Sequence, residues 1–122
     1  MAKAFSKTVL VVDDRADHAD SLAALISTMG HRTLVAYDVV TGLGLAHDVV
    51  PRIIFHDIVM PDVDGFAAVR ELRKHEKFAA TVMVAITALA WPEIEEDALA
   101  AGFDLYLRKP ARLRELEKVL NP

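Results

Sequence analysis

The stretch IIFHDIVMP, residues 53–61, indicates how this chain folds and where its site lies. Three apolar residues that favour β-structure lead towards Asp57, and Pro61 then marks a turn. A run of this kind is typical of a buried strand whose carboxyl end carries a functional side chain. An aspartate at such a position is also common as a loop start or a helix cap. Its meaning therefore depends on what the rest of the chain brings beside it.

Composition narrows the class of protein. A length of 122 residues suits one domain with a core of its own, and 53% hydrophobic with 26% charged residues indicates a globular chain. The absence of cysteine excludes a disulfide scaffold, thiol catalysis and a Cys-based zinc site. A net charge of -4 gives no reason to expect nucleic-acid binding. No apolar run is long enough for a membrane span or a signal peptide, so we expect a cytoplasmic protein.

Strand patterns and helix patterns alternate along the chain. Strands are expected at 8–12, 33–37, 53–57, 82–86 and 104–107. Helices are expected at 16–29, 39–47, 65–75, 92–101 and 112–120, with Asp64 as the cap of the third and Pro92 in the first turn of the fourth. Apolar strands without polar alternation are buried on both faces. The pattern therefore predicts an α/β fold in which a parallel sheet lies between helices.

Polar side chains occupy the expected carboxyl ends of these strands, where α/β sheets bind their ligands. They are Asp13 and Asp14, Asp57, Thr87 and Lys109. Adjacent carboxylates repel one another unless a cation neutralises them, and oxygen ligands without His or Cys suit Mg²⁺. A lysine and a hydroxyl can hold phosphoryl oxygens, and an aspartate can accept the phosphoryl group. These residues therefore predict phosphoryl transfer.

From Val9 to Leu120 the chain resembles the receiver domain of two-component response regulators. The residues that carry the resemblance are Asp13-Asp14, the segment 57–65, Thr87-Ala88 and Lys109-Pro110, together with Gly42, Pro51 and Ala101-Gly102. The resemblance implies a flavodoxin-like doubly wound (βα)5 fold with a five-stranded parallel sheet in the order 2-1-3-4-5. It also implies that residues 1–122 form a single receiver domain with a core at about 8–120.

The resemblance implies a phosphoryl acceptor at Asp57. The donor would be a phosphohistidine of a histidine kinase or of a histidine phosphotransfer protein. Mg²⁺ would be the cofactor, held by Asp13, Asp14, Asp57 and the carbonyl group of Val59. The domain would be a signalling module that catalyses its own phosphorylation and dephosphorylation, without acting on an external substrate.

The resemblance also implies a switch. Lys109, Thr87 and the amide of Ala88 would contact the phosphoryl group. Tyr106 matches the switch aromatic, whose inward turn would repack the face formed by the fourth helix, the fifth strand and the fifth helix. A downstream protein would bind that face, with no direct contact to nucleic acid or membrane. The module would be a stand-alone protein or part of a larger regulator or hybrid kinase.

Two other classes of function use similar residues. A metal-dependent phosphatase or phosphotransferase could also work through an aspartyl phosphate, but the Asp-x-Asp spacing of such a nucleophile is missing and no cap domain is available. A flavodoxin-like nucleotide binder would need a phosphate loop rich in Ser, Thr or Gly after the first strand, and none is present.

Several single residues keep two interpretations. Tyr106 could be an edge-strand aromatic, and Trp91 could contact a partner or pack locally. Arg15 could neutralise the acidic site when metal is absent. Val59 and Leu89 are apolar and cannot orient an attacking water, which predicts slow loss of the phosphoryl group. A basic cluster is either a solvated face or a partner surface: Arg108, Arg112, Arg114 and Lys118.

Overall fold

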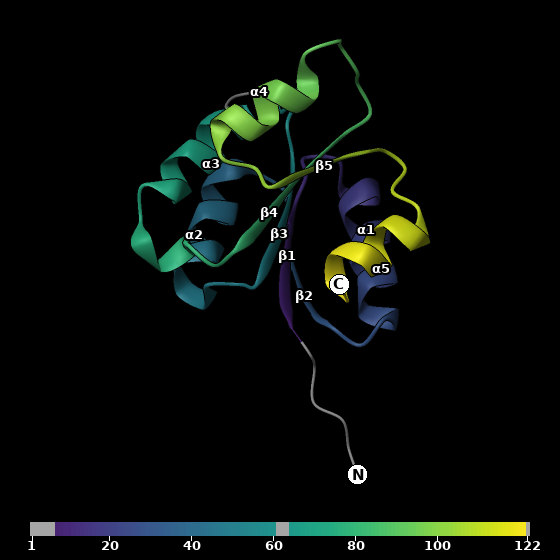
Figure 1. Ribbon diagram of the computed structural model, residues 1–122. Coiled ribbons are helices and arrows are strands. Elements are labelled where there is room, and N and C mark those ends of the chain that lie inside the picture. Colours follow the sequence, from purple (N-terminus) through teal and green to yellow (C-terminus); the bar gives the residue numbers. More distant parts are fainter. Residues whose placement is uncertain (1–6, 61–63, 122) are drawn as a thin grey trace.

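A five-stranded parallel sheet lies at the centre of the protein (Figure 1), in a computed structural model that describes residues 7–60 and 64–121. The strands are β1 (Thr8–Val12), β2 (Arg32–Ala36), β3 (Ile53–Asp57), β4 (Val82–Thr87) and β5 (Leu105–Arg108), in the order β2-β1-β3-β4-β5. The helices are α1 (Ala16–Thr28), α2 (Val39–Val49), α3 (Gly65–Arg73), the 3-10 helix η1 (Glu76–Phe78), α4 (Ile94–Ala101) and α5 (Leu113–Leu120). The predicted fold class and strand order are confirmed.

Two apolar layers cover the sheet because successive strand residues point to opposite faces. Val9 and Val11 pack with the buried side chains of α1 and α5, whereas Leu10 and Val12 pack with those of α2, α3 and α4. Figure 1 shows the same division, with α1 and α5 on one side of the sheet and the other three helices on the opposite side. Burial on both faces explains why these strands read as continuous apolar runs.

The start of α3 lies in close contact with the end of β3. The Asp64 carboxylate accepts a hydrogen bond from the Ala67 amide at 2.7 Å, so Asp64 caps this helix as predicted. The Gly65 amide donates to the Ile58 carbonyl at 2.8 Å. A Cβ atom at position 65 would lie 2.3 Å from the carbonyl oxygen of Asp57. Glycine is therefore what allows α3 to begin this close to the strand that carries Asp57.

Arg73, the last residue of α3, connects segments at the opposite end of the sheet. Its Nε atom donates to the Gly102 carbonyl at 2.8 Å, and its Nη1 atom donates to the carbonyls of Phe78 at 2.9 Å and Thr81 at 3.1 Å. The Asp104 carboxylate accepts from Nη2 at 2.7 Å. One side chain therefore attaches the segment before β4 and the α4–β5 connection to the end of α3.

The fourth helix begins later than predicted. Pro92 lies in a turn that precedes α4, because the Ile94 amide donates to the Trp91 carbonyl at 3.1 Å and closes that turn. Trp91 packs edge-to-face against Phe66, and its indole nitrogen donates to Asp97 at 3.0 Å. Local packing therefore accounts for this tryptophan.

Other boundaries differ by one or two residues. The second strand ends at Ala36, before the predicted Tyr37, because Ala36 pairs with the last residue of β1. The predicted helix 65–75 ends at Arg73, and Leu113, expected on the buried face of the last helix, is 50% exposed. Pro61, Asp62 and Val63 of the segment 57–65 lie outside the described residues. No helix of the described ranges has both the length and the apolar character that a membrane span requires.

His31, just before β2, is a buried polar side chain. It is 1% exposed, and neither ring nitrogen has a hydrogen-bond partner within residues 7–60 and 64–121. Burial, and secondly the charge of Lys7, lowers the pKa of the His31 imidazole below its ordinary value. The folded protein therefore holds a neutral ring, whereas the unfolded chain takes up a proton below pH ~6.5.

We expect the free energy of unfolding to fall as the pH drops below about 6.5, since the unfolded chain then binds more protons than the folded one. The contribution of His31 is at most about 1.4 kcal/mol per pH unit. His31→Phe should remove this contribution, and it should be more stable than the wild type near pH ~7 because it buries no unpaired nitrogen. Urea unfolding at neutral and mildly acidic pH measures both effects. An unchanged pH slope in the variant would contradict the prediction.

Candidate functional site

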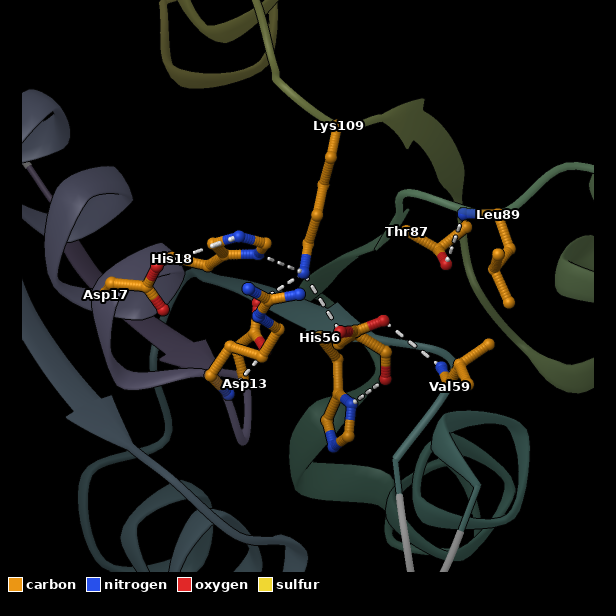
Figure 2. A network of polar contacts seen from close by, with 10 residues as sticks. Asp13, Asp17, His18, His56, Val59, Thr87, Leu89 and Lys109 are labelled. Atoms are coloured by element: carbon orange, nitrogen blue, oxygen red, sulfur yellow. Dashed lines mark hydrogen bonds and ion pairs between the residues drawn. The ribbon is translucent and has the colours of Figure 1, made fainter.

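The parallel pairing brings the predicted polar residues to one edge of the sheet. At this edge the pairs are Val12 with His56, Asp57 with Ile86, and Thr87 with Arg108. Asp57 closes β3, so its side chain lies on the face that α1 and α5 cover. Figure 2 shows His56 pointing away from the other labelled polar side chains, towards the opposite face, as expected from the alternation.

Lys109 is the residue that joins the site together (Figure 2). Its ammonium group donates to Asp13 Oδ2 at 2.6 Å and to Asp57 Oδ2 at 3.0 Å. The Lys109 side chain is 11% exposed, and the two carboxylates are 4% and 7% exposed. Its amide donates to the Thr87 carbonyl at 2.9 Å, which fixes the chain after β5 to the end of β4. The peptide bond between Lys109 and Pro110 is cis.

Burial and ion pairing shift the pKa values of Asp57 and Lys109. Burial raises the pKa of the Asp57 carboxyl, and the hydrogen bond and charge of Lys109 offset only part of that rise. Burial acts to lower the pKa of the Lys109 ammonium. The hydrogen bonds to Asp13 and Asp57, together with the negative charges of both carboxylates, outweigh burial and raise the pKa of Lys109 above its ordinary value. Lys109 is therefore a permanent cation beside a carboxylate that is costly to keep charged.

The cluster of three carboxylates suits a hard cation. Asp13, Asp14 and Asp57 each offer an oxygen, and these oxygens all lie within 4.8 Å of one another. One lysine balances only one of the three negative charges when all are ionised. Carboxylate oxygens without a sulfur ligand match the preference of Mg²⁺, which usually binds one or two carboxylates and keeps several waters. The exposed side chain of Asp14 leaves room for such waters.

The other residues predicted for the site near this cluster are Val59, Thr87 and Ala88. The Val59 amide donates to Asp57 Oδ1 at 3.1 Å, while the Val59 side chain is 46% exposed. Thr87 is buried, and its hydroxyl oxygen accepts from the Leu89 amide at 3.2 Å. Ala88 lines the same cavity as Asp13 and Lys109. The structure thus brings Asp13, Asp14, Asp57 and Lys109 together, with Thr87 and Ala88 at the next strand end.

Tyr106 is the second residue of β5. It pairs with Ala85, is partly exposed, and packs against the apolar layer that α2, α3 and α4 cover. Its place on this edge strand is compatible with both interpretations made from the sequence.

Arg15 and His18, which follow the acidic pair in the sequence, make contacts that the sequence did not predict. Arg15 contributes its amide, which donates to Asp13 Oδ1 at 3.0 Å, and among the described residues the ion pairs of Asp13 come from Lys109. Lys109 is therefore the cation that pairs with Asp13 here, and a neutralising role of the Arg15 side chain stays a prediction. His18, which sequence reasoning did not select, has its Nδ1 atom 3.1 Å from the Lys109 ammonium. The available signal was its place in the first turn of the helix that follows Asp13.

A cavity of about 480 Å³ opens beside the cluster, between α1 and the segment that follows β5. Asp13, Asp17, His18 and Lys109 give it a polar end, and the rest of its lining is mainly apolar, with Val11, Leu22, Leu25, Ile86, Pro110 and Ala111. The cavity therefore reaches Asp13 and Lys109, the lysine that pairs with Asp57.

The parallel sheet with strand order 2-1-3-4-5 defines an α/β protein with the flavodoxin-like fold. The carboxylates and their paired lysine lie at the carboxyl edge of this sheet. Residues 9–121 match the family model of the response regulator receiver domain, and the chain belongs to this family. Members of the family are signalling modules of two-component systems.

Individual relatives agree with this assignment. The protein PilH of Pseudomonas aeruginosa is 31% identical over 113 residues, which cover 93% of each chain. The chemotaxis protein CheY4 of Vibrio cholerae has a TM-score of 0.86 at 27% identity and covers 98% of this chain and 97% of its own. A further match comes from the co-crystal structure of the Saccharomyces cerevisiae histidine phosphotransfer protein Ypd1 and the receiver domain of Ssk1, with a TM-score of 0.81 at 25% identity, covering 96% and 88%. Longer relatives also match, and the chain spans 24% of one and 7% of another.

Proposed function

We propose that this receiver domain accepts a phosphoryl group on Asp57 from a phosphohistidine of a histidine kinase or a histidine phosphotransfer protein. The P–N bond of the donor breaks, a P–O bond to the Asp57 carboxylate forms, and the imidazole leaves after taking up a proton. The observation that carries the proposal is the buried Asp57 carboxylate, held by the Val59 amide on one oxygen and by Lys109 on the other. Such a carboxylate is a fixed nucleophile beside a fixed cation.

The acidic cluster supports a role for Mg²⁺. Bound there, the ion would neutralise charge on the phosphoryl oxygens during transfer. Asp13, Asp14, Asp57 and the carbonyl group of Val59 are the residues that would hold it. Lys109 would then be free to pair with the phosphoryl group, because its two carboxylate partners would have another cation.

The switch proposed from the sequence is a shift between two states of the same fold. Thr87 and the Ala88 amide would turn towards the phosphoryl group. Tyr106 would follow by turning inward, and the face of α4, β5 and α5 would change for a downstream protein. Leu99 and Leu105 on this face are 50% and 42% exposed, which supports its use as a contact surface.

Labelling with radiolabelled phosphoramidate, a small donor with a P–N bond, tests the proposed function. We expect label that depends on Mg²⁺, is lost with EDTA and is released by hydroxylamine, as an acyl phosphate requires. The same protein should not turn over a chromogenic phosphate ester. Steady ester turnover without stable label would instead favour a phosphatase.

The lifetime of the phosphoryl group gives a second prediction. Val59 and Leu89 expose apolar side chains, 46% and 55%, and cannot hydrogen-bond a water that attacks phosphorus. Val59→Asn supplies such a group and should shorten the half-life roughly tenfold, equivalent to about 1.4 kcal/mol of barrier. Val40→Asn, the same change at a 78% exposed valine of α2, is the matched control. Release of label within seconds from the wild type, or no acceleration by Asn, would contradict the prediction.

A further inference from the structure

The Lys109 ammonium group has three hydrogen-bond acceptors around it, as many as it has donors. Two are the carboxylates of Asp13 and Asp57, at 2.6 and 3.0 Å. The third is Nδ1 of His18, at 3.1 Å, on a helix that begins 93 positions earlier in the chain. Figure 2 shows the His18 imidazole next to the nitrogen atom of Lys109 that also contacts Asp13. His18 is therefore the one member of this set that is not a carboxylate.

We infer that His18 is a positioning residue, which holds the Lys109 ammonium directed at Asp57 during phosphoryl transfer. The inference rests on the proposed function. The two carboxylate contacts weaken when a divalent cation binds the carboxylates and when Asp57 becomes an acyl phosphate, because their negative charge is then shared or removed. The imidazole contact involves neither carboxylate, so neither event removes the acceptor that His18 offers.

The contact requires a particular form of the ring. Nδ1 can accept from an ammonium only if it carries no proton, so the proton of the neutral ring lies on Nε2. Nε2 faces Asp17 Oδ2 at 4.0 Å, too far for a hydrogen bond but close enough for the N–H dipole to be favourable. A proton on Nδ1 would instead place two donors against each other. The contact with Lys109 is thus a hydrogen bond only in the tautomer that carries its proton on Nε2.

The backbone holds His18 in this place. The next residue, Ala19, is fully buried in the layer formed with Val9, Val11 and the inner side of α5. The Ala19 amide donates to the Arg15 carbonyl at 2.9 Å, which fixes the first turn of α1. The His18 side chain itself is 32% exposed at the rim of the cavity, so its replacement should not disturb the core.

The test uses three replacements of the same ring and phosphoramidate with Mg²⁺ as the probe. His18→Leu removes the acceptor, His18→Asn places an amide oxygen near the position of Nδ1, and His18→Gln carries its amide out to the position of Nε2. We expect Leu and Gln to slow labelling by about three- to tenfold, the range for one hydrogen bond to a charged group that water partly replaces. Asn should restore most of the rate. Equal rates for Leu and the wild type would overturn the inference.

A readout without metal or donor separates positioning from catalysis. In metal-free protein, proton–nitrogen NMR of the lysine ammonium groups should show a slowly exchanging signal, assigned to Lys109 by its loss in Lys109→Arg. This signal should disappear in His18→Leu and persist in His18→Asn. A signal unchanged in His18→Leu would show that the imidazole does not hold the ammonium, and would overturn the inference.

A Lys109→Ala background and a control replacement complete the test. In Lys109→Ala, His18→Leu should cause no further loss of labelling, because a residue that acts through Lys109 has nothing left to position. A second, independent loss would assign His18 another role and overturn the inference. His75→Leu, the same replacement at an exposed histidine after α3, should label like the wild type. Failure of the proposed function is seen separately, as label that persists in Asp57→Asn.

Discussion

Asp57→Asn is expected to reduce phosphoramidate labelling to background, at least about a hundredfold below the wild type, the scale of losing the reacting group. The amide has the shape of the carboxylate, and its one oxygen can still accept from either the Val59 amide or Lys109, which donate to different oxygens of Asp57. It lacks the negative charge that makes the oxygen a nucleophile. Label that is released by hydroxylamine should therefore disappear while the fold remains.

The control for this variant is Asp48→Asn, the same change at an exposed aspartate of α2. It should label like the wild type. Asp57→Asn should unfold in urea at a concentration at least as high as the wild type, since it removes a buried charge whose pKa burial raises. Undiminished label in Asp57→Asn would place the acceptor at another residue and would contradict the proposed function.

Gly65→Ala is expected to have the largest effect on stability, about 3 kcal/mol or more, at the upper end of what overpacking costs. Its Cβ would lie 2.3 Å from the Asp57 carbonyl oxygen and 2.8 Å from the Ile58 Cα atom, both of them backbone. The Asp57 carbonyl cannot move away freely, because His56 Nδ1 donates to it at 2.7 Å. The start of α3 or the end of β3 must shift, so labelling at Asp57 should fall as well.

Gly44→Ala is the matched control for Gly65→Ala. A Cβ at position 44, inside α2, has no described atom within 4 Å apart from its chain neighbours and the backbone of its own helix. Alanine in a helix interior is more favourable than glycine by roughly 0.5–1 kcal/mol, so this variant should be slightly more stable than the wild type. Urea unfolding of both variants measures the contrast. A Gly65→Ala protein within about 0.5 kcal/mol of the wild type would show that the approach of α3 to β3 is not rigid.

The sheet was predictable because its central strands are apolar on both faces. Val9 to Val12 and Val82 to Ile86 contact helices on both sides, so each strand reads as one unbroken run. The boundaries were less predictable, since neighbours set them. Residue Tyr37 suits a strand by its own preference, but β1 has no residue left to pair with it.

The acidic part of the site was also predictable, because parallel strands bring their carboxyl ends to one edge. The hydrogen bonds within it were not. Arg15 is adjacent to the acidic pair in sequence, yet the cation that reaches Asp13 is Lys109, 96 positions away. His18 joins the cluster only because α1 packs with its first turn over the end of β1, a relation that depends on tertiary structure.

The four hydrogen bonds of Arg73 have a mechanical consequence for signalling. Two of them attach the connection between α4 and β5 to the end of α3, and the other two attach the segment before β4, at the edge of the sheet remote from Asp57. A displacement that begins at Thr87 would therefore act on a helix whose far end is fixed. Such a helix tilts about that end, so the movement is greatest near the phosphoryl group and smallest at Gly102. A partner that reads the signal would sense an angle rather than a translation.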